Sequence, residues 1–424
     1  MTVSPPTPDP GTTLCALFQA AIDAASPDLC LPPHLPPPPR GRTLVVGAGK
    51  AAAAMAAAVE RHWSGPLSGL VITRYGHGVP CQRVEVVEAA HPVTDEAGIR
   101  ATARMLDLLR GLTADDLVLC LISGGGSALL AAPAPGLTLT DKQQVGRALL
   151  KSGATIAEMN CVRKHLSAVK GGRLARMAAP APVVTLMISD VPGDDPATIA
   201  SGPTLPDAST RHEALAVLAK YDIKVPDAVT AWLSDPASET PKSLADLPPG
   251  KASIIATPAG AIAAAAERAR GMGIAPLFLG SAIEGEARAV AAWHADFVRA
   301  VTSGAIPAKR PCLLLSGGET SVMVRGKGRG GRNAEFLLAL AIELNGHPGV
   351  HALAADTDGI DGSEDNAGAW IGPDTLSRAA QAGIIPRRLL DDNDGYGFFQ
   401  AMGSLLFTGP TRTNVNDFRA ILIE

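Results

Sequence analysis

A glycine turn, an arginine at the start of an expected helix and an acidic loop follow one another between residues 316 and 362. The three segments read Ser316-Gly317-Gly318-Glu319-Thr320, Gly330-Gly331-Arg332-Asn333 and Asp356-Thr357-Asp358-Gly359-Ile360-Asp361-Gly362. A polyanionic substrate and its metal require backbone N–H groups, a guanidinium and carboxylates, and these segments supply all three. The combination indicates phosphoryl transfer.

The second segment leads into an apolar helical run at residues 333–344. Arg332 would therefore stand at a helix N-terminus, where backbone N–H groups and the guanidinium can converge on one anion. We expect Arg332 to be a catalytic residue. The residues expected to bind a cofactor in this half of the chain are Gly317, Gly318, Glu319, Gly330, Gly331 and Asn333.

The acidic loop follows an apolar run at residues 351–355, which we expect to be a strand. Acids at a strand end suit Mg²⁺, which takes one or two carboxylates and otherwise keeps waters and phosphate oxygens. Asp356 and Asp358 are the candidate metal ligands, and a purely structural turn remains the alternative. A calcium loop is disfavoured because no glutamate stands at the spacing that such a loop needs.

Two further glycine turns lie in the first half of the chain, each after an apolar run. Anions bind at the carboxyl ends of strands in open α/β sheets, although each glycine could also serve backbone geometry alone. Lys50 would add charge beside a helix N-terminus, where an anion would offset it, so it is a second catalytic candidate. No GxxxxGK[ST] motif occurs. The candidate cofactor-binding residues here are Gly47, Gly49, Ser123, Gly124, Gly125, Gly126 and Ser127.

Asp190 follows another apolar run, at residues 183–188. In that position it could bind a metal or accept a proton from a hydroxyl, so it is a candidate for both roles. The densest basic segment, residues 160–173, is expected to place Arg163, Lys170 and Arg173 near one helical face. That face could meet a carboxylate substrate or merely water, and taken alone the pattern favours water.

Alternating apolar runs and helical patterns must position these residues. The expected strands of the first half are continuous apolar runs bounded by turn residues, as in parallel strands covered by helices on both faces. They lie at residues 43–46, 69–73, 117–122 and 183–188. This pattern predicts an α/β fold with a doubly wound sheet.

The length of 424 residues exceeds the roughly 250–300 at which a single core usually stops growing. A polar, proline-rich stretch marks the best boundary. We therefore expect an N-terminal domain at 1–235, a linker region at 236–251 and a C-terminal domain at 252–424, where residues 253–256 begin a new sheet. Residues 191–207 are too long for an ordinary connection and are expected to form a functional loop.

The composition excludes several classes of protein. A net charge of −4 gives no basic surface for nucleic acid. The alanine-rich stretches are far shorter than the ~20 apolar residues of a membrane span. Six cysteines without a CxxC pair indicate neither a zinc site nor a disulfide framework. The N-terminus lacks the pattern of a secretory signal, so the cytoplasm is the expected location.

The motifs, in their order along the chain, resemble those of the class II glycerate 2-kinases. The similarity runs from about residue 12 to 420 and includes the glycine turns, the basic segment and the acidic loop described above. Further matching segments are His91-Pro92, Ser189-Asp190-Val191-Pro192-Gly193-Asp194 and Ser201-Gly202-Pro203-Thr204.

The resemblance implies ATP- and Mg²⁺-dependent phosphorylation of D-glycerate to 2-phosphoglycerate. It also implies a Rossmann-like N-terminal domain and a smaller C-terminal α/β domain with the active-site cleft between them. Lys50 and Arg332 match active-site positions of that family, and Asp190 matches an acidic position at the cleft. The oligomeric state stays open, a homodimer included.

Two other functions remain as alternatives. Relatives of this family also carry the name hydroxypyruvate reductase, and Gly47-x-Gly49-x-x-Ala52 fits a relaxed dinucleotide fingerprint. Against an NAD(P)H-dependent reductase, Lys50 crowds the phosphate turn and no acid ends the second expected strand. A non-catalytic sensor of sugar acids would have no need for the acidic loop.

Overall fold

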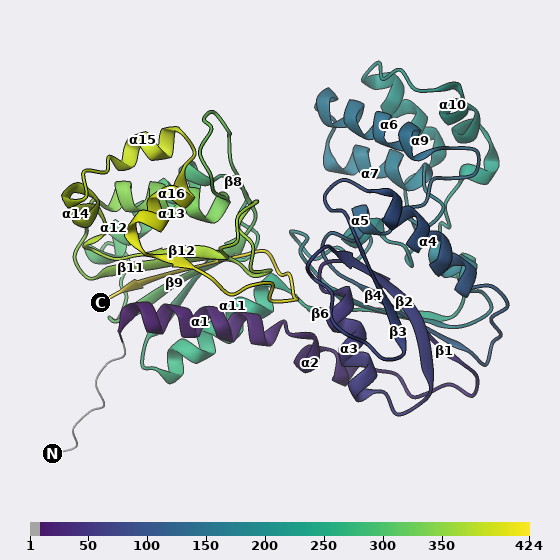
Figure 1. The fold of residues 1–424 in the computed structure, drawn as a ribbon, viewed down its shortest axis with the longest axis horizontal. Helices are drawn as coiled ribbons and strands as arrows, with labels where there is room; N and C mark the ends of the chain where they lie inside the picture. The colour runs from purple at the N-terminus through teal and green to yellow at the C-terminus, as the bar shows by residue number, and fades with distance from the viewer. Residues whose placement is uncertain (1–8) are drawn as a thin grey trace. The chain divides into compact units, whose positions relative to one another are not determined.

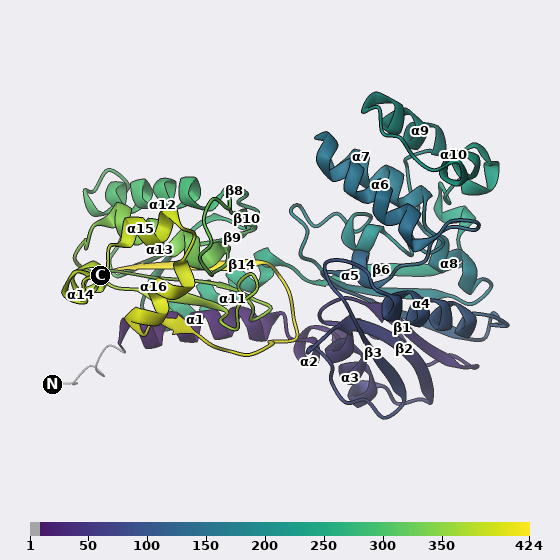
Figure 2. The same ribbon diagram turned by 45° about the horizontal axis from the view of Figure 1, so that its top comes forward.

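The computed structural model describes residues 9–424, which form two compact units. The N-terminal unit runs from Pro27 to Ile255, and the C-terminal unit joins residues 9–26 to Ala256–Glu424. Both are layered α/β structures (Figures 1 and 2), the first coloured purple to teal and the second mainly green to yellow. The chain is therefore of the α/β class that its sequence predicts.

The N-terminal unit is built on a six-stranded sheet in the order β3-β2-β1-β4-β5-β6. The pairings from β3 to β5 are all parallel. Strands β1 and β4 are buried along their whole length, which continuous apolar runs permit and alternating ones do not. The strands are β1 (Thr43–Ala48), β2 (Leu67–Arg74), β3 (Val84–Ala89), β4 (Leu117–Ile122), β5 (Val183–Ile188) and β6 (Gly250–Ala256).

Helices pack on this sheet and also form a layer with an apolar core of its own (Figure 1). The additional layer consists of α6 (Leu139–Ser152), α7 (Ile156–His165), α9 (Arg211–Lys220) and α10 (Asp227–Ser234). Capping boxes fix the starts of α6, α7 and α9. The other helices are α2 (Pro27–Cys30), α3 (Ala52–His62), α4 (Glu96–Leu108), α5 (Gly126–Leu129) and α8 (Arg173–Ala178), with 3₁₀ turns at Pro32–His34, Ile199–Ser201, Pro236–Ser238 and Leu244–Asp246.

The C-terminal unit contains a second six-stranded sheet, in the order β13-β12-β11-β14-β9-β7. Its central strand β14 is antiparallel to both neighbours, β9 and β11, so these two end at the edge where β14 begins. The strands are β7 (Ala275–Gly280), β9 (Cys312–Gly318), β11 (Val350–Asp356), β12 (Gly368–Ile371), β13 (Leu405–Leu406) and β14 (Asp417–Ile423), and the short β8 (Gly285–Glu286) and β10 (Thr320–Ser321) pair separately.

Helices cover this sheet on both faces. In both views α1 (Pro10–Ala24) and α11 (Pro258–Gly271) lie on one face, and α12 (Ala287–Thr302) and α13 (Arg332–Leu344) lie on the other (Figures 1 and 2). The main apolar core of the unit lies between the second pair of helices and the sheet. The remaining helices are α14 (Thr375–Gln381), α15 (Pro386–Asp391) and α16 (Gly395–Met402).

The observed division of the chain differs from the expected boundaries. Helix α1 belongs to the C-terminal unit, although residues 1–235 were expected to form one domain; of these, residues 1–8 lie outside the described part. The run at 253–256 belongs to β6, the last strand of the first sheet, because it pairs beside β5 rather than starting the second sheet. The polar stretch before it contains two 3₁₀ turns.

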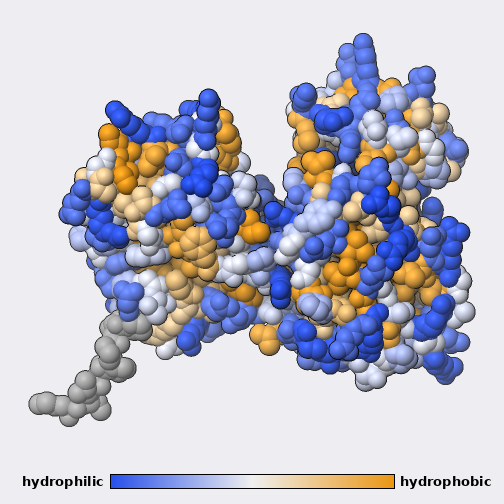
Figure 3. Space-filling model, viewed as in Figure 1, coloured by the Kyte–Doolittle hydropathy of each residue, from blue (hydrophilic) through white to orange (hydrophobic). Residues whose placement is uncertain are grey.

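The length and hydropathy of the described helices show which of them could span a membrane. On the face drawn in Figure 3, hydrophobic residues lie in patches among hydrophilic ones. Within residues 9–424, no single helix is both long and apolar enough to cross a bilayer. The bent pair formed by α1 and Pro27–His34 together has the length and composition of a span, and Leu14 and Leu17 of α1 are fully buried in the protein.

Candidate active site

Three polar turns of the N-terminal unit meet at one edge of its sheet. Strands β1, β4 and β5 are adjacent and parallel, so Lys50, the turn at 123–127 and Asp190 all follow strands that end at the same edge. The N–H of Lys50 donates to the carbonyl oxygen of Gly124 at 2.8 Å, and the N–H of Ala51 donates to Ser123 Oγ at 2.9 Å. These contacts hold the first two turns directly against each other.

Close packing accounts for three of the predicted cofactor-binding glycines. A Cβ on Gly47 would lie 2.0 Å from the carbonyl oxygen of Leu121, and one on Gly49, with φ +142°, would lie 2.1 Å from Ser123 Oγ. A Cβ on Gly126 would lie 2.8 Å from Ala200 Cβ. The neighbouring strand and loop therefore require these glycines whether or not a ligand binds.

Gly125 differs because candidate functional side chains face it. Its φ is +80°, and a Cβ there would lie 3.0 Å from the His91 ring and 3.4 Å from Lys50 Cγ. The backbone N–H groups of Gly124 and Gly125 have no acceptor among residues 9–424, so they can receive an anion. Lys50, His91 and Asp190 each interact with another group of the protein and are not free.

The long segment after β5 folds back onto the glycine turn. Ser201 Oγ lies 2.8 Å from Ser127 Oγ, and the carbonyl oxygens of Ser201 and Gly202 accept the N–H groups of Gly171 at 3.1 Å and Gly172 at 2.8 Å. Ala200 and Ser201 both have a positive φ, of +51° and +63°. Residues with side chains adopt such angles only where the surroundings over-determine them, so the segment is a fixed part of this site.

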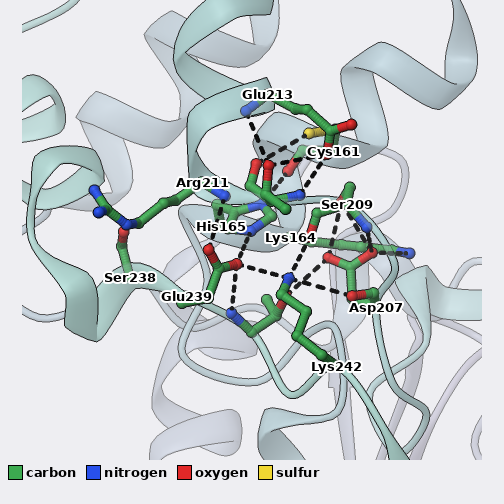
Figure 4. Close-up of polar contacts among 12 residues, drawn as sticks. Cys161, Lys164, His165, Asp207, Ser209, Arg211, Glu213, Ser238, Glu239 and Lys242 are labelled. Atoms are coloured by element: carbon green, nitrogen blue, oxygen red, sulfur yellow. Dashed lines mark hydrogen bonds and ion pairs between the residues drawn. The ribbon is translucent and has the colours of Figure 1, made fainter.

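The basic segment does not form one cationic face. Helix α7 ends at His165 and α8 begins at Arg173, and Lys170 lies in the connection between them, so the expectation of a shared helical face is wrong for both Lys170 and Arg173. Lys164 pairs with Asp207 at 3.2 Å, and His165 lies between the carbonyl oxygen of Cys161 at 2.8 Å and Glu239 at 3.1 Å (Figure 4).

Arg173 donates to the carbonyl oxygen of Ser238 at 2.6 Å, and Ser238 directly precedes Glu239 in the chain. Lys164, His165 and Arg173 are therefore structural. Arg163 and Lys170 have no carboxylate partner in the described part of the chain.

In the C-terminal unit, Arg332 is held by three carboxylates. Its Nε donates to Asp417 at 2.7 Å, and its two terminal nitrogens donate to Glu319 and Asp356 at 2.8 Å each. The sheet topology explains this meeting, because Glu319 follows β9, Asp356 ends β11 and Asp417 begins β14 at one edge. Burial opposes the charge of Arg332, but the three carboxylates outweigh it and raise the pKa of the guanidinium.

A fourth acid occupies the N-terminus of α13. The carboxylate of Asp361 accepts the N–H groups of Asn333 at 3.0 Å and Ala334 at 2.9 Å. A Cβ on Gly331 would lie 2.3 Å from Asp361 Oδ1, so glycine is needed for this approach. The backbone donors expected to receive a ligand at this helix therefore already bind a protein carboxylate. Burial raises the pKa of Asp361 to about 6, against the lowering effect of the two N–H donors.

The predicted metal ligands do not form a ready-made cage. Asp356 Oδ1 accepts the N–H of Asp358, and Asp358 Oδ1 accepts the N–H of Ile360, so both acids also shape their loop. Asp190 belongs to the other unit. Within residues 9–424, no group of three His, Cys, Asp or Glu side chains is placed to hold a metal. One or two carboxylates still suffice for Mg²⁺ that arrives with phosphate oxygens.

The glycine pair after β9 also has a packing role. A Cβ on Gly318, with φ +118°, would lie 2.2 Å from the backbone nitrogen of Ile283, and one on Gly317 would lie 2.8 Å from Ile262 Cδ1. Ser316, before the pair, is 2.8 Å from Nε2 of the buried His294.

Sequence reasoning missed three residues of this site: Asp417, Arg419 and His294. Asp417 Oδ2 accepts from Arg419 at 2.7 Å, so this fully buried carboxylate lies between two guanidiniums. An Asp and an Arg in alternate positions of an apolar final run were the available signal, because isolated charges are rarely buried without partners.

Comparison with known proteins places these observations in a family. Residues 13–234 match a family described as a domain of unknown function, DUF4147, and residues 312–417 match the MOFRL family. The chain is 41% identical over 403 residues to the D-glycerate 2-kinase of Thermotoga maritima, covering 95% of each protein. It is 53% identical over 410 residues to an Agrobacterium vitis protein provisionally named a hydroxypyruvate reductase, covering 96% of this chain and 93% of that protein.

A solved structure extends the similarity to the fold. The crystal structure of the glycerate kinase of Thermotoga maritima matches with a TM-score of 0.90 at 40% identity, covering 98% of this chain and 99% of that one.

Proposed function

The chain belongs to the glycerate 2-kinase family, and from that premise we propose how its own residues serve the reaction. It transfers a phosphoryl group to the 2-hydroxyl of D-glycerate. The observation that carries this function is the match, over nearly the full length and in fold as well as sequence, to a D-glycerate 2-kinase.

The donor in our proposal is ATP, bound in part at the carboxyl edge of the first sheet. The strand order and parallel pairing support a Rossmann-like, doubly wound topology, in which phosphates bind beside β1 and β4. The unpartnered N–H groups of Gly124 and Gly125 support phosphate binding at this turn. Gly47, Gly49 and Gly126 contribute by allowing the backbones to approach, as their packing indicates.

Lys50 and Asp190 take the catalytic roles in the N-terminal unit. The stem of Lys50 lies over Gly125, so its ammonium can offset charge on the transferring phosphoryl group. Asp190, at the end of β5, would orient the 2-hydroxyl and accept its proton. Because the transferring group needs little covalent help, such positioning and charge stabilisation supply most of the rate.

Arg332 takes the corresponding role in the C-terminal unit. Its side chain is 23% exposed, and Glu319 is its most exposed partner at 48%. A donor phosphate would replace Glu319 on the guanidinium, while Asp417 and Asp356 keep the fork in its plane. In this proposal Gly330, Gly331 and Asn333 position the arginine rather than the nucleotide.

Mg²⁺ would be held by Asp190 in the N-terminal unit, or by one or both of Asp356 and Asp358 in the C-terminal unit, and would neutralise charge on the donor phosphates. The donor set fits, since carboxylates are the ligands that this ion takes from proteins.

A reductase is the second candidate because a close relative carries that name and β1 ends in a glycine turn. An NAD site needs an acid at the end of the second strand, and β2 ends at Thr73-Arg74 instead, where an arginine would suit only the 2′-phosphate of NADP. Lys50 also occupies the turn where the pyrophosphate would lie.

The two candidates separate in one assay. The purified protein with D-glycerate, ATP and Mg²⁺ should release ADP and form 2-phosphoglycerate. With hydroxypyruvate and NADH or NADPH it should consume no cofactor. Cofactor oxidation without ADP release would reverse the assignment.

A further inference from the structure

Two lysines bind backbone carbonyls in and just after the glycine turn at 123–127, and the charge of Arg163 acts on both of them. Lys170 Nζ donates to the carbonyl oxygen of Ser127 at 2.8 Å, and Lys142 Nζ donates to the carbonyl oxygen of Ala132 at 3.4 Å. Lys142 lies on α6, and the third cation, Arg163, lies on α7. The three residues come from separate elements and are brought together only by the fold.

This cluster has no counter-charge in the described part of the chain. Neither lysine nor Arg163 forms an ion pair with any carboxylate of residues 9–424. The neighbouring Lys164, by contrast, pairs with Asp207 at 3.2 Å. Buried charges in proteins are ordinarily paired, so an unpaired group of cations is suited to an anion from outside.

The electrostatics of the cluster agree with that conclusion. Burial, followed by the charge of Arg163, lowers the pKa of Lys142 to about 8. Burial, with the charges of Lys142, Arg163 and Lys164 added, lowers the pKa of Lys170 well below its usual range. A bound anion would favour the protonated form of both lysines.

The cluster also lies beside the glycine turn at 123–127. Lys50 lies over Gly125, and Lys170 binds Ser127, two residues further along. In a 2-hydroxy acid the carboxylate is bonded to the carbon that bears the reacting hydroxyl. The cation that holds this carboxylate must therefore stand close to the transferring phosphoryl group, as this cluster does.

We propose that Lys142, Arg163 and Lys170 form the subsite for the carboxylate of the hydroxy-acid acceptor, an inference that rests on the glycerate 2-kinase function. Arg163 supplies the planar fork for the two oxygens, and the lysines supply the surrounding positive charge. The donor phosphates bind elsewhere, at the N–H groups of Gly124 and Gly125. The subsite selects anionic acceptors over neutral ones.

The test uses Arg163→Gln and Lys142→Gln in the full chain, with Lys151→Gln on the exposed end of α6 as the matched control. KM is measured for D-glycerate and for ATP separately, and turnover is also measured with glyceramide, the neutral amide of the acceptor. We expect the KM for D-glycerate to rise about 10- to 100-fold in Arg163→Gln, the loss typical of a charge-assisted hydrogen-bond pair. The KM for ATP should stay unchanged, and the preference for glycerate over the amide should fall by the same factor.

The outcomes are distinct. A rise in the KM for ATP alone would overturn the proposal by assigning the cluster to the donor, and so would unchanged constants in both variants. An amide preference that stays at the wild-type level despite a raised KM for glycerate would show a merely structural effect and would also overturn it. If the wild-type protein released no ADP with D-glycerate, the kinase function itself would fail, which is a separate result.

Discussion

Replacing Arg332 by lysine separates the role of this side chain in the fold from its role in the reaction. The guanidinium binds Asp417, Asp356 and Glu319 at once, at 2.7 to 2.8 Å. A lysine keeps the charge, but its compact ammonium cannot span the three carboxylates. Asp417 stays paired with Arg419, so Asp356 is the buried acid that loses most.

The expected magnitudes follow from these contacts. Removing the cation altogether, as in Arg332→Ala, breaks a largely buried pair and should cost about 3–5 kcal/mol of unfolding free energy. Arg332→Lys loses hydrogen bonds that are partly open to solvent, so it should cost roughly 1–3 kcal/mol. On the reaction, loss of the planar fork at the donor phosphate should lower kcat about 10²- to 10³-fold, the usual effect of removing one aligned donor.

A matched control is available in the same unit. Arg288 is 24% exposed against 23% for Arg332, and it pairs with the buried Glu335 at 2.6 Å. Arg288→Lys should therefore lose similar stability without loss of kcat. Unfolding is followed by denaturant titration and kcat by coupled ADP release at saturating substrates. The expected loss of kcat in Arg332→Lys is about 10²- to 10³-fold, so a kcat within about threefold of wild type would refute the catalytic role of Arg332.

Three further predictions follow from the two units. Lys50→Met keeps the apolar stem over Gly125 and should lower kcat about 10²-fold or more with an unchanged melting temperature. The control Lys151→Met should change neither kcat nor the melting temperature, and equal activity of the two variants would remove Lys50 from the site. Burial lowers the pKa of His294 to about 4, so the neutral ring contributes its full stability above pH 6.5. As pH falls from 6.5 to 4, the unfolding free energy should fall by about 1.4 kcal/mol per pH unit, and His294→Gln should lack this slope. Burial and the charge of Arg163 lower the pKa of Lys142 to about 8, so Lys142 should lose its proton as pH rises through that value and the KM for D-glycerate should rise above it. In Arg163→Gln the rise should move to higher pH because a repelling charge is gone.

The first sheet could be predicted because its strands are buried on both faces. The expected strands at 117–122 and 183–188 coincide with β4 and β5, since a continuous apolar run between turn residues has few other uses. Strand β14 could not be found in this way. It is central and fully buried, yet Asp417 and Arg419 interrupt its apolar run, and only their tertiary partners make that burial tolerable.

The domain boundary was harder to predict for a related reason. The apolar face of α1 would suit any uncovered sheet, and composition does not tell which sheet it covers. The structure packs it with α11 in the C-terminal unit. Composition also marked the proline-rich stretch before Gly250 as a boundary, although the chain completes one more strand of the first sheet after it.

At the site, residue types were predictable and their partners were not. A glycine turn followed by a cation indicates an anion site, but it does not tell whether the anion is a ligand or a side chain. At α13 it is the side chain of Asp361, which is supplied from a loop nearly thirty residues further along the chain. The partners of Arg332 depend in the same way on the order of β9, β14 and β11.

This arrangement has a consequence for binding. An arginine already held by three carboxylates is aligned before substrate arrives, but a phosphate must compete with an acid that is in place. Asp417 and Asp356 are buried, so either of them, displaced from Arg332, would lose a hydrogen-bonded ion pair where water cannot replace it. Glu319 is half exposed, so water can solvate it once released. Glu319→Gln should therefore lower the KM for ATP while leaving the KM for D-glycerate unchanged, and a raised KM for ATP would instead mean that Glu319 helps to bind the donor.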